Sequence, residues 1–325
     1  MNKTAGAITL LKIPDSARAR RAVRNLDSSH PAKRDFPVWH FSMLNDDRRN
    51  RAIEQCINDL PLAGKTVVEI GTGTGLIALM FARAGAERVI TCEMNHNLAD
   101  VARHIIESTE YNDRITIIER NSSDAIAEGL LPTAPDYIFT ETVDCGVVGE
   151  SFFEIATDIQ KIAGAQTIVL PGQIRQIGMV VQSQQLLDLN SVVDVCGFDL
   201  SVLNAFSTPT YFPVHEQLYD YKALSEPAML RQYEYLSNLP TPTVTPAIVN
   251  DGLASGIMSW MEIDFGGHMF SNEPGITSHW HKAFHPFDKP VEISAGESLE
   301  LTMDDDGKAI CDLLDGAARI KRVSI

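Results

Sequence analysis

Two glutamates frame a short loop near the middle of the chain. Glu141 and Glu150 stand at the two ends of the segment 141–150, which reads ETVDCGVVGE. The loop follows a short apolar run that is typical of a buried strand, and ligands bind beyond the carboxyl ends of strands in open α/β sheets. A guanidinium group presents a planar fork of N–H donors, and two carboxylates form a natural cage for it. The loop therefore predicts a site that holds a guanidinium.

A second chemical pattern lies upstream, in the segment Glu69–Gly75 (EIGTGTG). Glycine lets the backbone turn sharply and approach a ligand closely, and the helix that follows offers N–H groups without partners. Gly71, Gly73 and Gly75 have the spacing G-x-G-x-G, whereas dinucleotide-binding turns have G-x-G-x-x-G. Glu93 ends the next apolar run, where a carboxylate takes both ribose hydroxyls. The pattern favours S-adenosylmethionine as cofactor, with NAD or a purely structural turn as alternatives.

A third group of polar residues precedes an amphipathic pattern that begins near residue 50. Asn45 or Asp46 has the type of a helix N-cap, and Arg48 and Arg49 follow in the first turn. An arginine in this position can bind the carboxylate of S-adenosylmethionine bidentately. Taken alone, the pair is more typical of solvated surface charges.

These residues need a fold that brings them together, and the pattern of apolar residues in the first half of the chain predicts one. Apolar runs with strand character alternate with helical patterns, and the connections are short. The expected strands cover 66–70, 88–93, 115–119, 137–140 and 167–170, and the expected helices cover 76–84, 95–108 and 152–162. Such alternation is typical of a doubly wound, Rossmann-like α/β sheet.

Beyond Pro171 the pattern changes to strands without intervening helices, separated by Gly, Pro, Asn and Asp. The clearest candidates are 177–181, 256–265, 291–293 and 299–303. We therefore expect an N-terminal extension over 1–35, a cofactor-binding domain over 36–171 and an antiparallel, β-barrel-like domain over 172–325. Within the last of these, 225–236 has helical composition, which predicts a helical arm at about 203–238.

Composition excludes several classes of function. The net charge is −16 and there is no strong basic run, so we expect no nucleic-acid partner. No stretch reaches the roughly 18 apolar residues of a membrane span. The five cysteines are scattered without a C-x-x-C pair, which predicts neither a disulfide framework nor a metal site. A reducing cytoplasm is the expected setting.

Taken together, four separated blocks resemble the protein arginine methyltransferase family, and among its members the arginine methyltransferase 7 type. The resemblance runs from about residue 36 to the C-terminus. The blocks are Met43-Leu44-x-Asp46-x-x-Arg49-Asn50, Glu69-x-Gly71-x-Gly73-x-Gly75, the loop Glu141 to Glu150, and Ser278-His279-Trp280. Four blocks in the family's order are more specific than any one alone.

The resemblance implies a role for each residue of the cofactor site. Arg49 would bind the cofactor carboxylate, and the turn Glu69–Gly75 would bend around the methionine moiety. Glu93 would hold the ribose. Ser123 or Asp124 would contact adenine.

The same resemblance implies roles around the acceptor. The two glutamates of the loop would grip the guanidinium, beside Trp280 as a substrate-binding residue. Met43 would sit next to the acceptor nitrogen, and His279 would pair with Asp46. The arm would dock on a second subunit and form a homodimer.

The acceptor remains open at this stage between an arginine side chain of a protein and free arginine or a related guanidino metabolite. A protein that binds S-adenosylmethionine for regulation without catalysis is an alternative of a different class. Two facing carboxylates would have no physical purpose in it. A methyltransferase acting on an oxygen or another nitrogen is the remaining alternative, although a carboxylate pair suits a neutral acceptor poorly.

Overall fold

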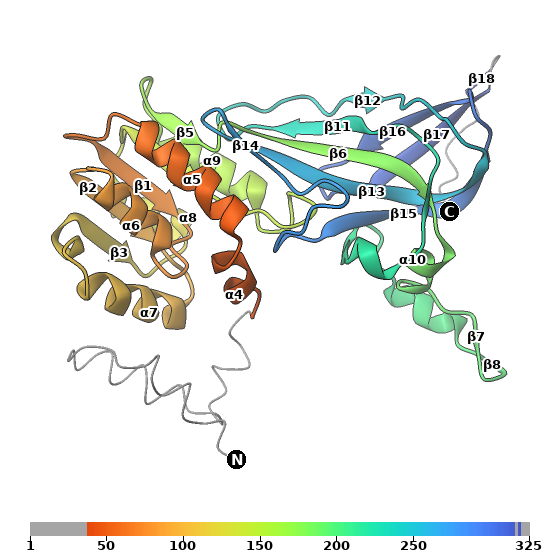
Figure 1. Cartoon of the computed structure of the whole chain (residues 1–325), viewed down its shortest axis with the longest axis horizontal. Coiled ribbons are helices and arrows are strands. Elements are labelled where there is room, and N and C mark those ends of the chain that lie inside the picture. Colours follow the sequence, from red (N-terminus) through yellow and green to blue (C-terminus); the bar gives the residue numbers. More distant parts are fainter. Residues whose placement is uncertain (1–37, 316–317, 320–325) are drawn as a thin grey trace. The chain divides into compact units, whose positions relative to one another are not determined.

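The computed structural model describes residues 38–315 together with 318 and 319. The expected extension over 1–35 lies outside the described residues. Contacts divide the chain into two units, whose elements are labelled in Figure 1. The first unit holds the described residues through Thr142 together with Glu154–Pro171. The second holds Val143–Phe153 and the described residues from Gly172 onward.

The first unit contains a five-stranded parallel sheet in the order β3-β2-β1-β4-β5. Its strands are β1 (Thr66–Ile70), β2 (Arg88–Cys92), β3 (Ile115–Ile118), β4 (Tyr137–Thr140) and β5 (Ile168–Leu170). The helices are α4 (Trp39–Leu44), α5 (Asp47–Asp59), α6 (Leu76–Arg83), α7 (His96–Glu107), α8 (Ser122–Ala127) and α9 (Phe152–Ile162), with the short 3-10 turn η1 (Asn112–Arg114). The predicted doubly wound sheet is confirmed.

Local sequence explains where these elements lie. The central strand β1 is buried over its last four residues, as is typical of a central strand in a parallel sheet that is covered on both faces. Helix α7 begins after Asn95, whose side chain accepts hydrogen bonds from the N–H groups of Asn97 and Leu98. Phe81 of α6 packs edge-on against Phe139 of β4, with ring centroids 5.8 Å apart. Burial of each such side chain stabilises the fold by about 1.5–3 kcal/mol.

The second unit is built from antiparallel strands, as predicted. A seven-stranded sheet has the order β10-β6-β13-β15-β9, with β11 paired to β6 and β14 to β13. Its strands are β6 (Gln173–Gln182), β9 (Phe212–Val214), β10 (Lys222–Ala223), β11 (Ala228–Tyr233), β13 (Gly252–Phe265), β14 (His268–Ser271) and β15 (Lys282–Ile293).

Two smaller sheets and three short helices complete the second unit. The four-stranded sheet has the order β12-β16-β17-β18, and β7 and β8 form a hairpin. The remaining elements are β7 (Asp194–Val195), β8 (Phe198–Asp199), β12 (Thr243–Val244), β16 (Ser298–Met303), β17 (Ala309–Asp315), β18 (Ala318–Arg319), α10 (Gln184–Asp188), η2 (Ser201–Phe206) and η3 (Glu216–Leu218).

The expected helix over 225–236 is wrong, and a helical arm at about 203–238 is not confirmed. Residues Ala228–Tyr233 form strand β11, which pairs with β6. Leu230 and Tyr233 are 1% and 3% exposed, so they belong to the core of this unit. Backbone pairing and burial on the sheet override the helical composition of the segment.

Exposed apolar side chains instead gather in residues 189–206, which we call the apolar segment. It includes the β7–β8 hairpin and η2, and it extends away from the long strands of its unit in Figure 1. Val202 and Phe206 are 86% and 85% exposed. The other exposed apolar members are Leu189, Val193, Val195, Phe198, Leu200 and Leu203. Within the described part of the chain, no helix has the length and apolar character that a membrane span needs.

Candidate active site

The glycine turn between β1 and α6 is tied to the neighbouring strand. The N–H groups of Gly71 and Thr72 both donate to the carbonyl of Cys92, at 3.0 Å. Gly71, Gly73 and Gly75 all have positive φ, at 88°, 54° and 86°, a region that other residues enter at a cost. Among the described residues, apart from Gly73 and its two chain neighbours, no atom lies within 4 Å of the place where a Cβ of Gly73 would stand. The turn is therefore open on the side from which a ligand can approach its backbone.

Glu93 follows β2 and faces this turn. One carboxylate oxygen accepts from the N–H of Gly73 at 2.9 Å, and the other accepts from the N–H of Asn95 at 2.8 Å. An ionised carboxylate has about four acceptor positions, so both oxygens keep capacity for the hydroxyls of a ribose. The arrangement fits the expected role of Glu93.

Glu69 lies beneath the turn and differs from Glu93 in its surroundings. It is 1% exposed, and its Oε2 has no hydrogen-bond partner among the described residues. Burial raises the pKa of Glu69 to about 8, and a hydrogen bond from Thr91 offsets part of that effect. Glu69 therefore holds its proton at neutral pH, and its expected place among the cofactor-binding residues stays a prediction.

Arg49 and Glu141 meet in the first unit, although 92 positions separate them. Asp46 caps α5 by accepting the backbone N–H of Arg49 at 3.1 Å. The Nε of Arg49 then donates to both carboxylate oxygens of Glu141, at 2.9 and 2.8 Å, and its Nη2 forms an ion pair with Oε2. Both side chains are buried. The carboxylate that the sequence assigns to an acceptor guanidinium thus already holds the guanidinium of Arg49.

The sheet brings the glycine turn and Glu141 to one edge. Ile70 is the last residue of β1, and its ladder partners are Cys92 of β2 and Thr140 of β4. The residues that follow these three positions are Gly71, Glu93 and Glu141. Parallel strands end at a common edge, so the cofactor turn, the ribose carboxylate and the first loop glutamate lie on neighbouring strand ends. A Cβ at Gly71 would stand 2.9 Å from Cγ2 of Thr142, which shows how closely the two loops approach.

The remainder of the loop belongs to the second unit, together with Glu150, His279 and Trp280. The indole N–H of Trp280 donates to the carbonyl of Val143 at 2.9 Å, and the side chain is buried. The ring of His279 lies 4.0 Å from that of Trp280. Trp280 therefore shapes the start of the loop through its hydrogen bond. The pairing of His279 with Asp46, a residue of the first unit, stays a prediction.

Ser123 and Asp124 lie in the first turn of α8. The hydroxyl of Ser123 donates to the carboxylate of Asp158 at 2.6 Å. The Asp124 carboxylate accepts from the side-chain amide of Asn121, which also accepts the Asp124 N–H. These bonds fix the loop after β3, where an adenine contact is expected. Met43 lies on α4 and is half-buried.

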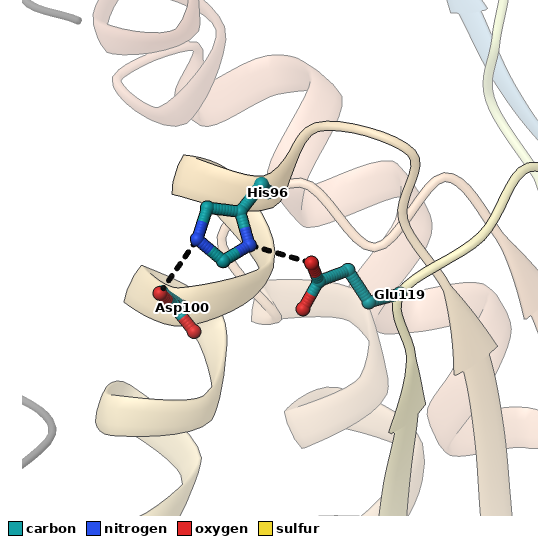
Figure 2. Close-up of side chains that lie close together, drawn as sticks. All are labelled: His96, Asp100 and Glu119. Carbon is teal, nitrogen blue, oxygen red and sulfur yellow. Dashed lines mark hydrogen bonds and ion pairs between the residues drawn. The ribbon is translucent and has the colours of Figure 1, made fainter.

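The described residues include one group with the composition of a metal site: His96, Asp100 and Glu119, drawn in Figure 2. His96 approaches both carboxylates (Figure 2), at 2.5 Å from Glu119 and 3.5 Å from Asp100. Arg103 donates to the same two carboxylates, at 2.8 Å each. Burial alone would raise the pKa of Glu119, but His96 and Arg103 outweigh it and hold the pKa below its usual range. The guanidinium supplies the cation, so we interpret the group as an ion-pair network joining α7 to β3.

Sequence reasoning missed two residues here, one inside the loop and one that contacts it. Asp144 lies inside it, and its carboxylate accepts the phenol hydroxyl of Tyr211 at 2.9 Å. The glycines of the loop signal a close approach, but nothing in the sequence identifies a partner 67 positions away.

Comparisons with known proteins agree with this architecture. The O-methyltransferase family model matches residues 59–158, which cover most of the parallel sheet. An arginine N(omega)-methyltransferase of Streptomyces achromogenes subsp. streptozoticus is 37% identical over 278 residues, covering 84% of this chain and 77% of that protein. Protein arginine N-methyltransferase 9 of Xenopus laevis is 25% identical and covers 86% of this chain, which spans 40% of that longer protein.

A solved structure shows the same fold. The Trypanosoma brucei PRMT1 enzyme–prozyme heterotetrameric complex with AdoHcy superposes with a TM-score of 0.71 at 17% identity, covering 86% of this chain and 95% of that chain.

The parallel sheet, the G-x-G-x-G turn and the carboxylate after β2 define an S-adenosylmethionine-dependent methyltransferase. The open backbone at Gly73 and the spare acceptor capacity of Glu93 fit that cofactor. Within this class, the identity shared over most of both chains with the Streptomyces protein places the chain in the arginine N-methyltransferase family.

Proposed function

We propose that this chain transfers a methyl group from S-adenosylmethionine to a guanidinium nitrogen of free arginine. The observation that carries the proposal is the close approach of the glycine turn to the first loop glutamate. Gly71 packs against Thr142, and Glu141 at this point holds a guanidinium, that of Arg49. The donor turn and a carboxylate suited to the acceptor therefore occupy adjacent strand ends.

The residues of the site have mainly to orient the acceptor. S-adenosylmethionine supplies, when bound, a methyl group that its sulfonium has already activated. A guanidinium stays protonated at ordinary assay pH and its lone pairs are delocalised, so it is a weak nucleophile. Carboxylates at Glu141 and Glu150 would bind the nitrogens that do not react and direct the remaining nitrogen along the line of transfer. That nitrogen gains the methyl group as the bond between the methyl carbon and the sulfonium sulfur breaks, and it releases one proton to solvent, so the product guanidinium keeps its positive charge.

Arg49 contributes by holding Glu141 in place. Its guanidinium orients the buried carboxylate through hydrogen bonds to both oxygens, while the carboxylate retains acceptor positions that Arg49 does not use. Arg49 also has an Nη1 group, which donates to Asn50 at 2.8 Å. We assign the binding of the cofactor carboxylate to this same guanidinium.

Free arginine is supported as the acceptor by the Streptomyces relative, which is named for arginine, whereas the Xenopus relative is named for protein arginine. The test incubates the purified protein with labelled S-adenosylmethionine and either free arginine or an arginine-glycine-rich peptide, followed by mass spectrometry. Methylated free arginine supports the proposal. Methylation of the peptide alone would show a protein substrate. Binding of the cofactor with no turnover on either acceptor would favour the non-catalytic alternative.

We further propose that two copies associate through the apolar segment, residues 189–206. The support is its concentration of exposed apolar side chains, with Val202 and Phe206 the most exposed, because patches of this kind mark interfaces. A two-fold dimer is the commonest soluble oligomer. Light scattering should give about 72 kDa, twice 35.8 kDa, and the variant Val202→Glu/Phe206→Glu should give the monomer mass. A monomeric wild-type protein at micromolar concentration would refute the dimer.

For localisation we propose a reducing cytoplasm, since the sequence has scattered cysteines without a paired motif. Cell fractionation followed by an activity assay checks this. Recovery of the activity from an oxidising compartment or the exterior of the cell would contradict it.

A further inference from the structure

One carboxylate closes the second half of the loop. Asp144 Oδ1 accepts the backbone N–H groups of Gly146 and Gly149, each at 3.1 Å. Its Oδ2 accepts the hydroxyl of Tyr211 at 2.9 Å. Tyr211 directly precedes β9, so this bond joins the loop to the antiparallel sheet within the second unit.

Three glycines make room for this contact. A Cβ at Gly146 would stand 2.2 Å from the Tyr211 ring, and one at Gly307 would stand 2.6 Å from it. At Gly149 a Cβ would lie 2.3 Å from the Asp144 carboxylate. Neither loop glycine has a positive φ, so what these positions require is space and not an unusual backbone conformation.

The backbone around Glu150 is held in conformations that need such support. Val147 and Ser151 have positive φ, at 76° and 63°, and Val147 is fully buried. A non-glycine residue with such a φ is strained and persists only where its surroundings fix it. Glu150 lies between these two residues, so its place depends on what fixes them.

Tyr211 has firm support of its own. Its ring lies 5.3 Å from that of His285, which is fully buried. His285 Nδ1 donates to the carbonyl of Gly307 at 2.7 Å, and its other nitrogen shares a hydrogen bond with Ser259. Burial lowers the pKa of His285 to about 4, so the imidazole stays neutral at ordinary assay pH. Burial and the neighbouring Asp144 raise the pKa of Tyr211, which keeps its hydroxyl as a donor.

We propose that Tyr211 and Asp144 form a positioning pair that fixes the loop around Glu150 and thereby sets how efficiently the acceptor guanidinium is methylated. The inference rests on the proposed function and adds to it two residues that do not contact the acceptor. The pair acts on the second glutamate of the loop, whereas Arg49 acts on the first.

The test replaces Tyr211 by phenylalanine, which removes the hydroxyl and keeps the ring. We expect kcat/KM for arginine to fall by about tenfold to a hundredfold, because small misplacements of a reacting group cost that much. Affinity for adenosylhomocysteine should stay within twofold, since the glycine turn and Glu93 belong to the first unit. The matched control is Tyr233→Phe, which removes a buried hydroxyl bonded to Gln176 of β6 at 3.1 Å and should leave kcat/KM unchanged.

A second pair of variants protects the test against simple misfolding. In Asp144→Asn the amide oxygen can still accept the two glycine N–H groups, and its NH₂ can donate to the Tyr211 oxygen. Asparagine should therefore retain most of the activity, and Asp144→Ala should lose at least as much as Tyr211→Phe. Activity retained in Asp144→Asn but lost in Asp144→Ala would show that the hydrogen bonds made by residue 144, and not its negative charge, position the loop.

The outcomes separate the two proposals. Wild-type turnover together with unchanged kcat/KM in Tyr211→Phe overturns the positioning pair and leaves the function standing. An equal loss in Tyr211→Phe and Tyr233→Phe overturns it too, since the effect would then come from the sheet in general. A wild-type protein that neither binds nor methylates arginine overturns the function and this inference with it.

Discussion

Glu141 and Glu150 are the same residue type at the two ends of one loop, yet different forces hold them. Glu141 directly follows β4, and an ion pair with Arg49 fixes its carboxylate. Glu150 lies in a stretch without regular structure, where a carboxylate, a tyrosine and closely packed glycines determine the backbone. The first end depends on charge and on a strand end, and the second depends on shape.

The difference has a consequence for tolerance to substitution. The guanidinium of Arg49 contacts both oxygens of Glu141, so charge and planar geometry together fix that carboxylate. At the other end, a Cβ at Gly146 would stand 2.2 Å from the Tyr211 ring, so the loop has no room there for a larger side chain. We therefore expect the position of Glu141 to depend on the guanidinium of Arg49, and the position of Glu150 to depend on the Asp144–Tyr211 contact and on the space left by the loop glycines.

The largest effects should come from the glutamates themselves. Glu141→Gln and Glu150→Gln each remove a charge that binds and orients the acceptor, so kcat/KM should fall by about 10²–10³. Calorimetry with adenosylhomocysteine should show affinity within a few fold of the wild type. Near-wild-type turnover in either variant would remove that residue from the guanidinium site.

Arg49→Lys should have the next largest effect. Lysine keeps the charge but lacks the planar fork that contacts both oxygens of Glu141, so we expect kcat to fall roughly tenfold to a hundredfold. Combining it with Tyr211→Phe tests the comparison directly. The two residues share no partner, so their effects on the activation free energy should add. A combined loss far from the sum would mean that the two ends are held by one mechanism.

Gly146→Ala should act on the Glu150 end alone. The new methyl group would meet the Tyr211 ring, so kcat should fall about tenfold or more, by the same misplacement argument. Gly73→Ala, in the cofactor turn, is the matched control: its cost is conformational, since nothing lies within 4 Å, and it should weaken adenosylhomocysteine binding. Weaker adenosylhomocysteine binding in Gly146→Ala, together with a loss of kcat alone in Gly73→Ala, would contradict the assignment of the first loop to the acceptor and the second to the cofactor.

The cofactor half of the site was largely predictable from sequence, because it follows from local rules. An apolar run, a glycine turn and an acid after the next strand place Gly73 and Glu93 together without knowledge of any distant residue. The Arg49–Glu141 pair was beyond such rules, since α5 and β4 meet only in the folded sheet. Tyr211 was missed for the same reason. The helix predicted over 225–236 was wrong because the composition of this segment gives no sign that its residues pair with strand β6.

A separate effect, on stability and not on turnover, concerns Glu69. Its pKa is raised to about 8 by burial, so between pH 4.5 and about 8 the folded protein holds a proton that the unfolded chain has lost. Stability should therefore be greatest below the unfolded pKa and should decrease as pH rises through this window. Urea unfolding from pH 5 to 9 should show a shallower decrease in Glu69→Gln. An equal slope in both proteins would show that Glu69 titrates normally.

The central claim is that the loop recognises a cationic guanidinium, and a comparison of arginine with citrulline tests it most directly. Citrulline has nearly the same shape, but a neutral urea replaces the guanidinium. Titration of each compound into the protein saturated with adenosylhomocysteine should show arginine binding about tenfold to a hundredfold more tightly, as expected for charge-assisted bonds of roughly 1.5–3 kcal/mol. Equal affinities, or binding of citrulline alone, would contradict the account.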